Sequence, residues 1–397
     1  MVSQQMYALG AQPSAIRQLF AYGQRKTAEI GAAQVFNFSI GNPSVPTPAE
    51  FNQCLSEIVL RGPSQVVHGY TSAAGDDAAR QAIANDLNQR FDTGYTKDHL
   101  FLTCGAAPAL TTVFKALSED GGVNEFIVSA PCFPEYQVFV EAAGGQLVVL
   151  PAETERFQID LTALAHAINP HTRAMIVNSP NNPSGVVYGE QTICDLAALL
   201  KRKAAEIGHP IYIISDEPYR EVVFHGCTVP FIPNYYPDTI VCYSYSKSLS
   251  LPGERIGYVL VPPAAAESRE VYLAIAGAAR AIGHVCAPSL LQQAVGRCAG
   301  LRPDISIYQR NADLLYEYLS AYGYQAVKPE GAFYLFFRSP KLLSAQQFSD
   351  LARDRYNILL VPGDGFGCPG WLRLSFCVET ERIEKALPLL DKLIKEL

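Results

Sequence analysis

Short apolar runs alternate with amphipathic stretches between about residues 98 and 262. Seven runs have the length and composition of strands: residues 100–104, 125–130, 146–150, 173–178, 211–215, 239–243 and 257–261. Four amphipathic segments among them predict helices at residues 108–117, 135–143, 161–168 and 192–207. Apolar strands that alternate with helices predict an α/β fold, with a mostly parallel seven-stranded sheet covered by helices on both faces.

The chain has a different character after about residue 300. The pattern there predicts a long helix at 305–322, an apolar strand at 332–337, two more helices and a strand at 371–376. This pattern is typical of an α+β domain. The first fifty residues have little sheet character, and we expect them to pack with this domain. The predicted organisation is therefore an N-terminal segment at 1–50, a large domain at 51–290 and a small C-terminal domain at 291–397.

Composition narrows the class of protein. The net charge of −7 and the lack of any basic block argue against nucleic acid as a partner. Residues 1–30 contain no apolar signal-peptide core, and no run reaches the ~18 apolar residues of a membrane span. The 10 cysteines stand singly, without a C-x-x-C pair, which is typical of buried thiols in a reducing compartment. The sequence predicts a soluble cytoplasmic protein without a metal site.

The most informative segment surrounds Lys247. Serines at 244 and 246 precede this lysine, and Arg255 follows it beside a glycine. An amine that forms a Schiff base needs neighbours that hold a phosphate-bearing aldehyde, and hydroxyls and a guanidinium suit that phosphate. The alternative is a solvated lysine in a serine-rich loop. The strand predicted at 239–243 favours the ligand site, because open α/β sheets bind ligands at the ends of their strands.

Two further segments follow predicted strands. Gly105, Ala106 and Ala107 open a helix, and small residues there let its free N–H groups approach an anion, although simple packing explains them too. Phe133 follows the strand at 125–130, where an aromatic ring could stack on a flat heteroaromatic molecule or belong to the core.

Polar side chains follow the next two strands. Asn182 lies in a turn made rigid by two prolines and a glycine, although a plain loop uses the same residue types. Asp216 ends a predicted buried strand, where a carboxylate is costly unless it has a partner. A pyridinium nitrogen would be such a partner. Alternatively, Asp216 could be the N-cap of the segment that follows it. The side-chain amide of Asn182 could donate to a phenolic oxygen of a bound ligand. Tyr219, three residues after Asp216, could reach the same ligand oxygen.

Taken in order, these motifs resemble the class I/II aminotransferases of the fold type I pyridoxal-phosphate enzymes. Gly41-Asn-Pro and Gly69-Tyr70 precede them, and Val361-Pro-Gly, Phe366-Gly and Arg373-Leu-Ser complete the set across nearly the whole chain. The resemblance implies pyridoxal 5′-phosphate as cofactor, held by Gly105, Ala106, Ala107, Phe133, Asn182, Asp216, Tyr219, Ser244, Ser246, Lys247 and Arg255, and by Tyr70 of the neighbouring subunit. It therefore also implies a homodimer with shared active sites.

The same resemblance assigns roles within the site. Lys247 forms the Schiff base, Asp216 pairs with the pyridine nitrogen, and Tyr219 and Asn182 contact the ring hydroxyl. Gly41, Asn182 and Arg373 bind the substrate, with Arg373 gripping its α-carboxylate. Lys247, Asp216 and Tyr219 are thus the predicted catalytic residues.

The predicted activity is ping-pong transfer of an amino group between an α-amino acid and a 2-oxo acid, as part of amino-acid metabolism. A C–S β-lyase of the same fold and a non-catalytic cofactor-binding regulator are the alternatives. The sequence departs from the family pattern at Ala107, where relatives often carry a polar residue. No arginine stands out as a clamp for a substrate side-chain carboxylate; Arg280 and Arg297 lie in the right region, but surface positions explain them better.

Overall fold

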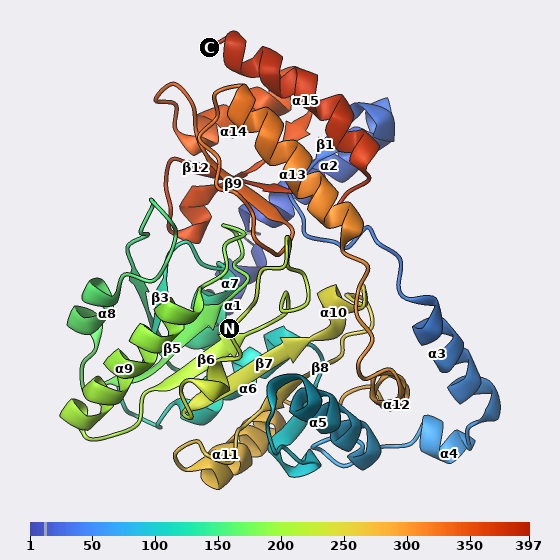
Figure 1. Cartoon of the computed structure of the whole chain (residues 1–397), viewed down its shortest axis with the longest axis vertical. Helices are drawn as coiled ribbons and strands as arrows, with labels where there is room; N and C mark the ends of the chain where they lie inside the picture. Colours follow the sequence, from blue (N-terminus) through green and yellow to red (C-terminus); the bar gives the residue numbers. More distant parts are fainter. Residues whose placement is uncertain (12–13) are drawn as a thin grey trace.

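A seven-stranded sheet forms the centre of the larger part of the molecule (Figure 1). The structure is a computed structural model that describes residues 1–11 and 14–397. The strands are arranged in the order β2-β8-β7-β6-β5-β3-β4. Their bounds are β2 Leu100–Thr103, β3 Glu125–Ser129, β4 Gln146–Leu150, β5 Thr172–Asn178, β6 Tyr212–Asp216, β7 Thr239–Ser244 and β8 Gly257–Leu260. Both antiparallel pairings of this sheet involve β8, which pairs with β2 and β7, and the other four pairings are parallel, so the predicted α/β fold with a mostly parallel sheet is confirmed.

Side chains alternate between the two faces of the sheet, as the two-residue period of a strand requires. On β5, Ala174 and Ile176 pack with helices α6, α7 and α11, whereas Met175 and Val177 pack with α8 and α9. These helices are α6 Ala106–Leu117, α7 Glu135–Ala142, α8 Leu161–Ala167, α9 Glu190–Ile207 and α11 Ser268–Ala281. Because both faces are covered, the strands are apolar throughout, which is the pattern seen in the sequence.

Another group of helices lies beside β2 and β8, and the sequence pattern did not predict them. It comprises α3 Ala49–Arg61, α4 Ser64–Val67, α5 Asp77–Phe91, α10 Tyr245–Ser248 and α12 Ser289–Arg297. On α5 the residues that face this core are Ala79, Ile83, Ala84 and Leu87. Two of these four are alanines, so the apolar stripe of the helix is faint in the sequence.

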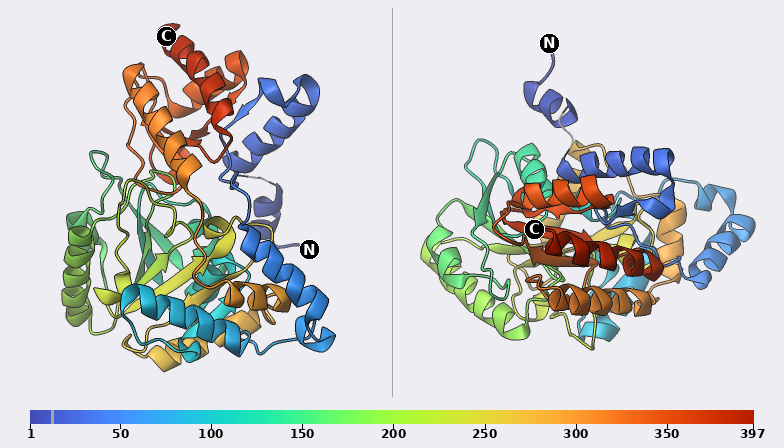
Figure 2. Two further views of the ribbon diagram at one scale, coloured as in Figure 1. Left: turned by 45° about the vertical axis from the view of Figure 1, so that its right-hand side comes forward. Right: turned by 90° about the horizontal axis from the view of Figure 1, so that it is seen from above.

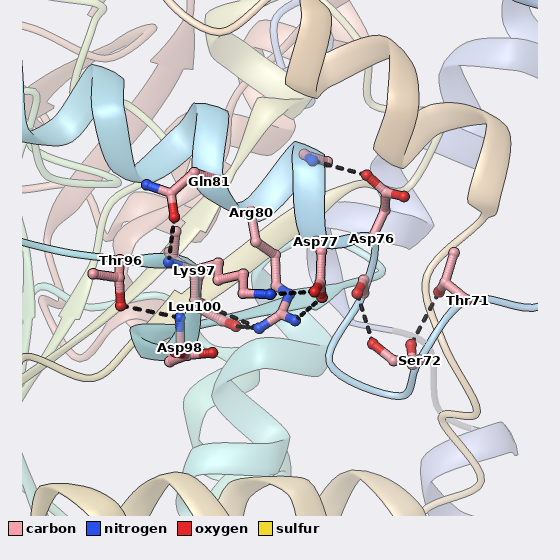
Figure 3. Close-up of polar contacts among 12 residues, drawn as sticks. Thr71, Ser72, Asp76, Asp77, Arg80, Gln81, Thr96, Lys97, Asp98 and Leu100 are labelled. Carbon is pink, nitrogen blue, oxygen red and sulfur yellow. Dashed lines mark hydrogen bonds and ion pairs between the residues drawn. The ribbon is translucent and has the colours of Figure 1, made fainter.

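A polar network on α5 fixes the start of β2 (Figure 3). The buried Arg80 donates to the backbone oxygens of Lys97 at 2.7 Å and Leu100 at 3.4 Å. Asp77 accepts from Arg80 at 2.5 Å and also pairs with Lys97. β2 leads from this network towards Gly105 and the start of α6.

The smaller part of the molecule is built on a three-stranded antiparallel sheet. Its order is β11-β12-β9, with β9 Tyr334–Arg338, β11 Val361–Pro362 and β12 Trp371–Ser375. Helices α13 Ser306–Ala321, α14 Ala345–Tyr356 and α15 Thr380–Lys395 share one apolar core with it. In Figure 1 these elements, in orange and red, lie above the large sheet. The strands predicted at 332–337 and 371–376 correspond to β9 and β12.

The N-terminal segment lies with these C-terminal elements (Figure 2). β1 Phe36–Asn37 pairs in parallel with β10 Ile358–Leu359, and α2 Ala15–Ile30 precedes it. α1 Gln4–Ala11 buries none of its residues and stands away from the body. Short 3-10 helices occur at η1 Ala32–Gln34, η2 Lys97–His99, η3 Ile232–Asn234 and η4 Gly363–Phe366. The domain boundaries at residues 50 and 290 stay predictions.

Among residues 1–11 and 14–397, none of the helices combines the length with the apolar character that a membrane span requires.

Candidate active site

The carboxyl ends of β5, β6 and β7 meet at the edge of the large sheet that faces the smaller sheet, and a cavity of about 300 Å³ opens there. Ligands of open α/β sheets bind at this edge. The cavity walls contain most of the predicted site residues: Gly41, Ala106, Ala107, Phe133, Asn182, Asp216, Tyr219, Ser244, Ser246, Lys247, Arg255 and Arg373. The cavity is therefore the candidate active site.

Asp216 is the last residue of β6 and is buried. Its Oδ2 accepts a hydrogen bond from the Tyr136 hydroxyl at 2.6 Å, and Asn178 donates to its backbone oxygen at 3.0 Å. Its Oδ1 is buried without a hydrogen-bond partner among the described residues. Burial raises the pKa of the Asp216 carboxyl to about 7, although the hydrogen bond from Tyr136 works in the opposite direction. This site suits a cationic N–H donor that would keep the carboxylate charged.

Lys247 lies on the short helix α10, directly after β7. Its Nζ donates to the backbone oxygen of Gly41 at 2.5 Å. Burial, with smaller contributions from Arg255 and Arg373, lowers the pKa of the Lys247 amine to about 8. Such an amine loses its proton more readily than a solvated lysine, and the neutral amine is the nucleophile in Schiff-base formation.

An anion cradle lies at the start of α6. Ser246 Oγ accepts from Ser244 Oγ at 2.8 Å and from Arg255 Nη1 at 3.2 Å. Gly105, the residue before the helix, has a φ of 89°, and a Cβ there would lie 2.6 Å from Arg255 Nη2. Only glycine lets the arginine approach the helix N-terminus so closely. Hydroxyls, a guanidinium and free helical N–H groups together suit a phosphate.

Arg373 reaches the cavity from β12, the central strand of the smaller sheet. Its Nη1 donates to Asn182 Oδ1 at 2.9 Å and its Nη2 to the Ser39 backbone oxygen at 2.6 Å. The guanidinium lies 4.5 Å from the Tyr334 ring centroid and 4.9 Å from that of Phe366. These contacts fix its plane, and a fixed guanidinium suits a carboxylate.

Two predicted residues lie outside the cavity walls. Gly105 backs the anion cradle, and Tyr70, on the loop after α4, is 88% exposed on its own chain. The roles of all the predicted site residues, including that of Tyr70 in a neighbouring subunit, stay predictions. Sequence reasoning assigned no role to Tyr136 or Asn178. A signal for Asn178 existed, because it is a polar residue at the end of an apolar strand, as Asp216 is.

Comparisons with known proteins agree with this geometry. A family model described as aminotransferase class I and II matches residues 33–390. The crystal structure of an amino transferase from Eubacterium rectale is 52% identical, with a TM-score of 0.97 over 100% of this chain and 99% of that chain. An aspartate aminotransferase from Thermotoga maritima is 27% identical, with a TM-score of 0.87 over 99% and 100% of the two chains. An aromatic-amino-acid aminotransferase from Thermococcus litoralis is 27% identical over 97% of this chain and 96% of its own.

Proposed function

This chain belongs to the aminotransferase class I and II family and is a pyridoxal-phosphate-dependent aminotransferase; from that premise we propose how its residues divide the reaction. Lys247, Asp216 and Arg373 carry the three main roles. One observation supports this most strongly: a reactive amine, an unpartnered carboxylate oxygen and a fixed guanidinium all border the same cavity. The proposed reaction is ping-pong transfer of an amino group between an amino acid and a 2-oxo acid.

The residues fit the cofactor at both of its ends. Ser244, Ser246, Arg255 and the N-terminus of α6 would hold the phosphate. The unpartnered Oδ1 of Asp216 would accept from the protonated ring nitrogen. When bound, pyridoxal phosphate supplies an electron sink for the bond that breaks at the substrate Cα. Asp216 sustains that sink by keeping the nitrogen protonated.

Arg373 and Lys247 act on the substrate itself. Arg373 pairs with the α-carboxylate, and the rings of Tyr334 and Phe366 keep the guanidinium from turning away. This restraint orients the Cα–H bond, so that binding contributes to the rate through positioning. Lys247, as a neutral amine, removes the Cα proton as a general base. Burial, which lowers the pKa of Lys247 to about 8, favours this role near neutral pH.

We propose a homodimer with shared active sites and a cytoplasmic location. Tyr70 is 88% exposed, and Val59, Leu60 and Val66 on α3 and α4 are large apolar side chains exposed nearby in the chain. Such a surface is typical of a subunit interface. All the cysteines are free thiols, which supports a reducing compartment. A monomeric mass by light scattering would contradict the homodimer.

The reaction itself has a direct test. Purified enzyme is mixed with an amino acid, and then with a 2-oxo acid, while the visible absorption of the bound cofactor is followed. We expect the amino acid to bleach the band and the 2-oxo acid to restore it, because the amino group is stored on the cofactor between the two half-reactions. Release of pyruvate and ammonia without storage of the amino group would instead identify a β-lyase.

A second prediction concerns Tyr136, which donates to Asp216 at 2.6 Å. Tyr136→Phe removes this donor but keeps the buried ring. Hydrogen bonds to charged groups contribute about 1.5–3 kcal/mol, so we expect cofactor affinity to fall by about 10- to 100-fold. Fluorescence titration of the cofactor-free protein measures the change. Tyr272→Phe, which removes a hydroxyl bonded to the Leu100 backbone oxygen, is the matched control. Equal affinities in the two variants would rule out a positioning role for Tyr136.

A further inference from the structure

The buried hydroxyl of Tyr334 is a group that the proposed division of roles leaves unused. Tyr334 opens β9 and lines the cavity, and its ring contacts the Arg373 guanidinium. Its hydroxyl shares a hydrogen bond of 2.8 Å with the hydroxyl of Tyr219, which is buried as well. Within residues 1–11 and 14–397 this is the one hydrogen bond of either hydroxyl. Buried hydroxyls need such partners, so each of these two groups determines what the other can do.

Tyr334 is held in place from several sides. A Cβ at Gly41 would overlap the Tyr334 hydroxyl oxygen, so this hydroxyl fills the space beside the glycine. A Cβ at Gly185 would lie 2.5 Å from the Tyr334 backbone oxygen, so the loop after β5 packs closely against β9. Tyr334 also pairs with Ser375 in the register between β9 and β12. Its hydroxyl is therefore presented to Tyr219 at a fixed position.

The direction of the shared hydrogen bond matters because a hydroxyl has one proton to donate. Tyr219 also lines the cavity, where the family resemblance implies that it contacts the ring hydroxyl of the cofactor. If Tyr219 donated to Tyr334, it could only accept from that ligand oxygen. If Tyr334 is the donor, the proton of Tyr219 is free to point into the cavity. The direction thus decides whether Tyr219 can stabilise negative charge on the ring oxygen.

The surroundings favour Tyr334 as the donor. The Arg373 guanidinium lies 4.5 Å from the centroid of its ring, and a cation there stabilises negative charge on the hydroxyl oxygen. Burial raises the pKa of both hydroxyls, Cys377 adds to this rise at both, and Arg373 opposes it at both. The hydrogen bond between them raises the pKa of Tyr219 further and lowers that of Tyr334. Tyr334 is therefore the stronger acid of the two, and the stronger acid is the better donor.

We propose, on the basis of the proposed transaminase function, that Tyr334 is a positioning residue that acts through Tyr219. Its hydroxyl donates to Tyr219 and so directs the Tyr219 proton towards the ring oxygen of the bound cofactor. A hydroxyl that accepts a hydrogen bond is also a stronger donor, because hydrogen bonds in a chain polarise one another. Since the ring of Tyr334 restrains Arg373, one side chain aligns both the cofactor contact and the carboxylate clamp.

The variant Tyr334→Phe tests this, because it removes the hydroxyl and keeps the ring against Arg373. Cofactor-free wild type and variant are titrated with pyridoxal phosphate and with its analogue that lacks the ring hydroxyl. We expect the variant to bind pyridoxal phosphate about threefold to tenfold more weakly, the effect of one neutral hydrogen bond, and to bind the analogue as the wild type does. An equal loss of affinity for both ligands would show that the hydroxyl only supports the fold, and would overturn the positioning role.

A second readout is the pH at which the visible absorption of the cofactor-loaded enzyme changes. This change marks loss of the proton that the bound cofactor holds between its Schiff base and its ring oxygen. A hydrogen bond from Tyr219 to that oxygen favours the form without the proton. We therefore expect Tyr334→Phe to raise the midpoint by about 0.4–1 pH unit. A midpoint that falls would mean that Tyr219 donates to Tyr334 in the wild type, and that result, or an unchanged midpoint, would contradict the proposal.

A double variant shows whether Tyr334 acts through Tyr219. In the Tyr219→Phe background we expect Tyr334→Phe to cause no further shift of the midpoint and no further loss of affinity, because the hydroxyl on which it acts is already gone. Additive effects would assign Tyr334 a route that bypasses Tyr219, and the proposal would be wrong. Tyr324→Phe is the matched control and should change neither readout, because it removes a buried hydroxyl that is bonded to the Leu390 backbone oxygen outside the cavity.

These outcomes are distinct from a failure of the proposed function. If no amino acid bleaches the visible band of the wild type, the transaminase assignment is wrong, and the inference is wrong as well. If bleaching and recovery occur as expected but Tyr334→Phe matches Tyr324→Phe in both readouts, the function stands and the role of Tyr334 is overturned.

Discussion

Lys247→Ala is expected to abolish the visible absorption of the Lys247-bound cofactor and to lower transamination at least about 10⁴-fold. The substitution removes both of the functions proposed for this amine, the covalent attachment of the cofactor and the general base at Cα. Nothing nearby replaces it, because the other two cations of the cavity within the described residues, Arg255 and Arg373, are guanidiniums that stay protonated. Absorption spectra of the purified variant and its steady-state turnover with the best donor measure the loss.

Two controls separate the amine from its charge and from general effects of lysine loss. Lys247→Arg retains a positive charge against the Gly41 carbonyl but cannot form a Schiff base, so it should be as inactive as the alanine variant. Lys115→Ala removes a lysine from the last turn of α6, outside the cavity, and should leave turnover unchanged. Near-wild-type turnover in Lys247→Ala would remove the basis of the assignment.

The sequence predicted the site residues that stand at the ends of apolar strands. Asp216 ends such a strand, and Lys247 and Asn182 lie shortly after one. Parallel strands bring their carboxyl ends to one edge of the sheet whatever the conformation of the loops between them. Burial makes this pattern strong, since a polar residue directly after a buried strand interrupts a continuous apolar run. The large sheet was predictable for the same reason.

Other parts of the site carry no such pattern. Ile16 and Ile40 line the cavity as isoleucines, and nothing in their type separates a cavity wall from a core. The N-terminal segment that carries them is held beside the C-terminal elements by the pairing of β1 with β10, which joins positions over three hundred residues apart along the chain, and by the hydrogen bond from the Ser375 N–H to the Phe38 backbone oxygen. The reversed direction of β8 is equally hidden, because an antiparallel strand buried on both faces is as apolar as a parallel one.

The electrostatics around Asp216 depend on pairing that the sequence does not reveal. Its neighbour Glu217 is also buried, but Arg220 pairs with it through two close contacts. Glu221, nearly buried, pairs with Arg90 at 3.0 Å. Of the two fully buried carboxylates in the described chain, Asp216 is thus the one without a cationic partner. The lack of a cationic partner within the described chain supports the proposed pairing of Asp216 with the ring nitrogen of the cofactor.

Asp216→Ala is therefore expected to weaken cofactor binding strongly and to slow the proton transfer at Cα. Removal of one member of a buried charge pair costs about 3–5 kcal/mol, which corresponds to a Kd about 10² to 10⁴ times higher. The remaining bound cofactor would lose ring protonation and with it most of the electron withdrawal that acidifies Cα. Titration of the cofactor-free protein and single-turnover kinetics at saturating cofactor measure the two effects separately.

Asp216→Asn gives the matched control, because it removes the charge and keeps the shape. In the cofactor-free wild type, burial raises the pKa of Asp216 to about 7 from 3.8. The folded protein then holds a proton that the unfolded chain releases, so its free energy of unfolding falls as pH rises from about 4 to 7, by up to about 4 kcal/mol. In the asparagine variant this decrease in the free energy of unfolding is absent. Urea unfolding at pH 5 and pH 8 should therefore show that the variant becomes more stable relative to the wild type at pH 8 than at pH 5. With cofactor bound, the wild type should be the more stable of the two proteins at pH 8, because the pyridinium of the cofactor stabilises a carboxylate that only the wild type has. Identical pH dependence in the two proteins would mean that Asp216 is already compensated by the chain, and its proposed pairing with the ring nitrogen would then have no electrostatic basis.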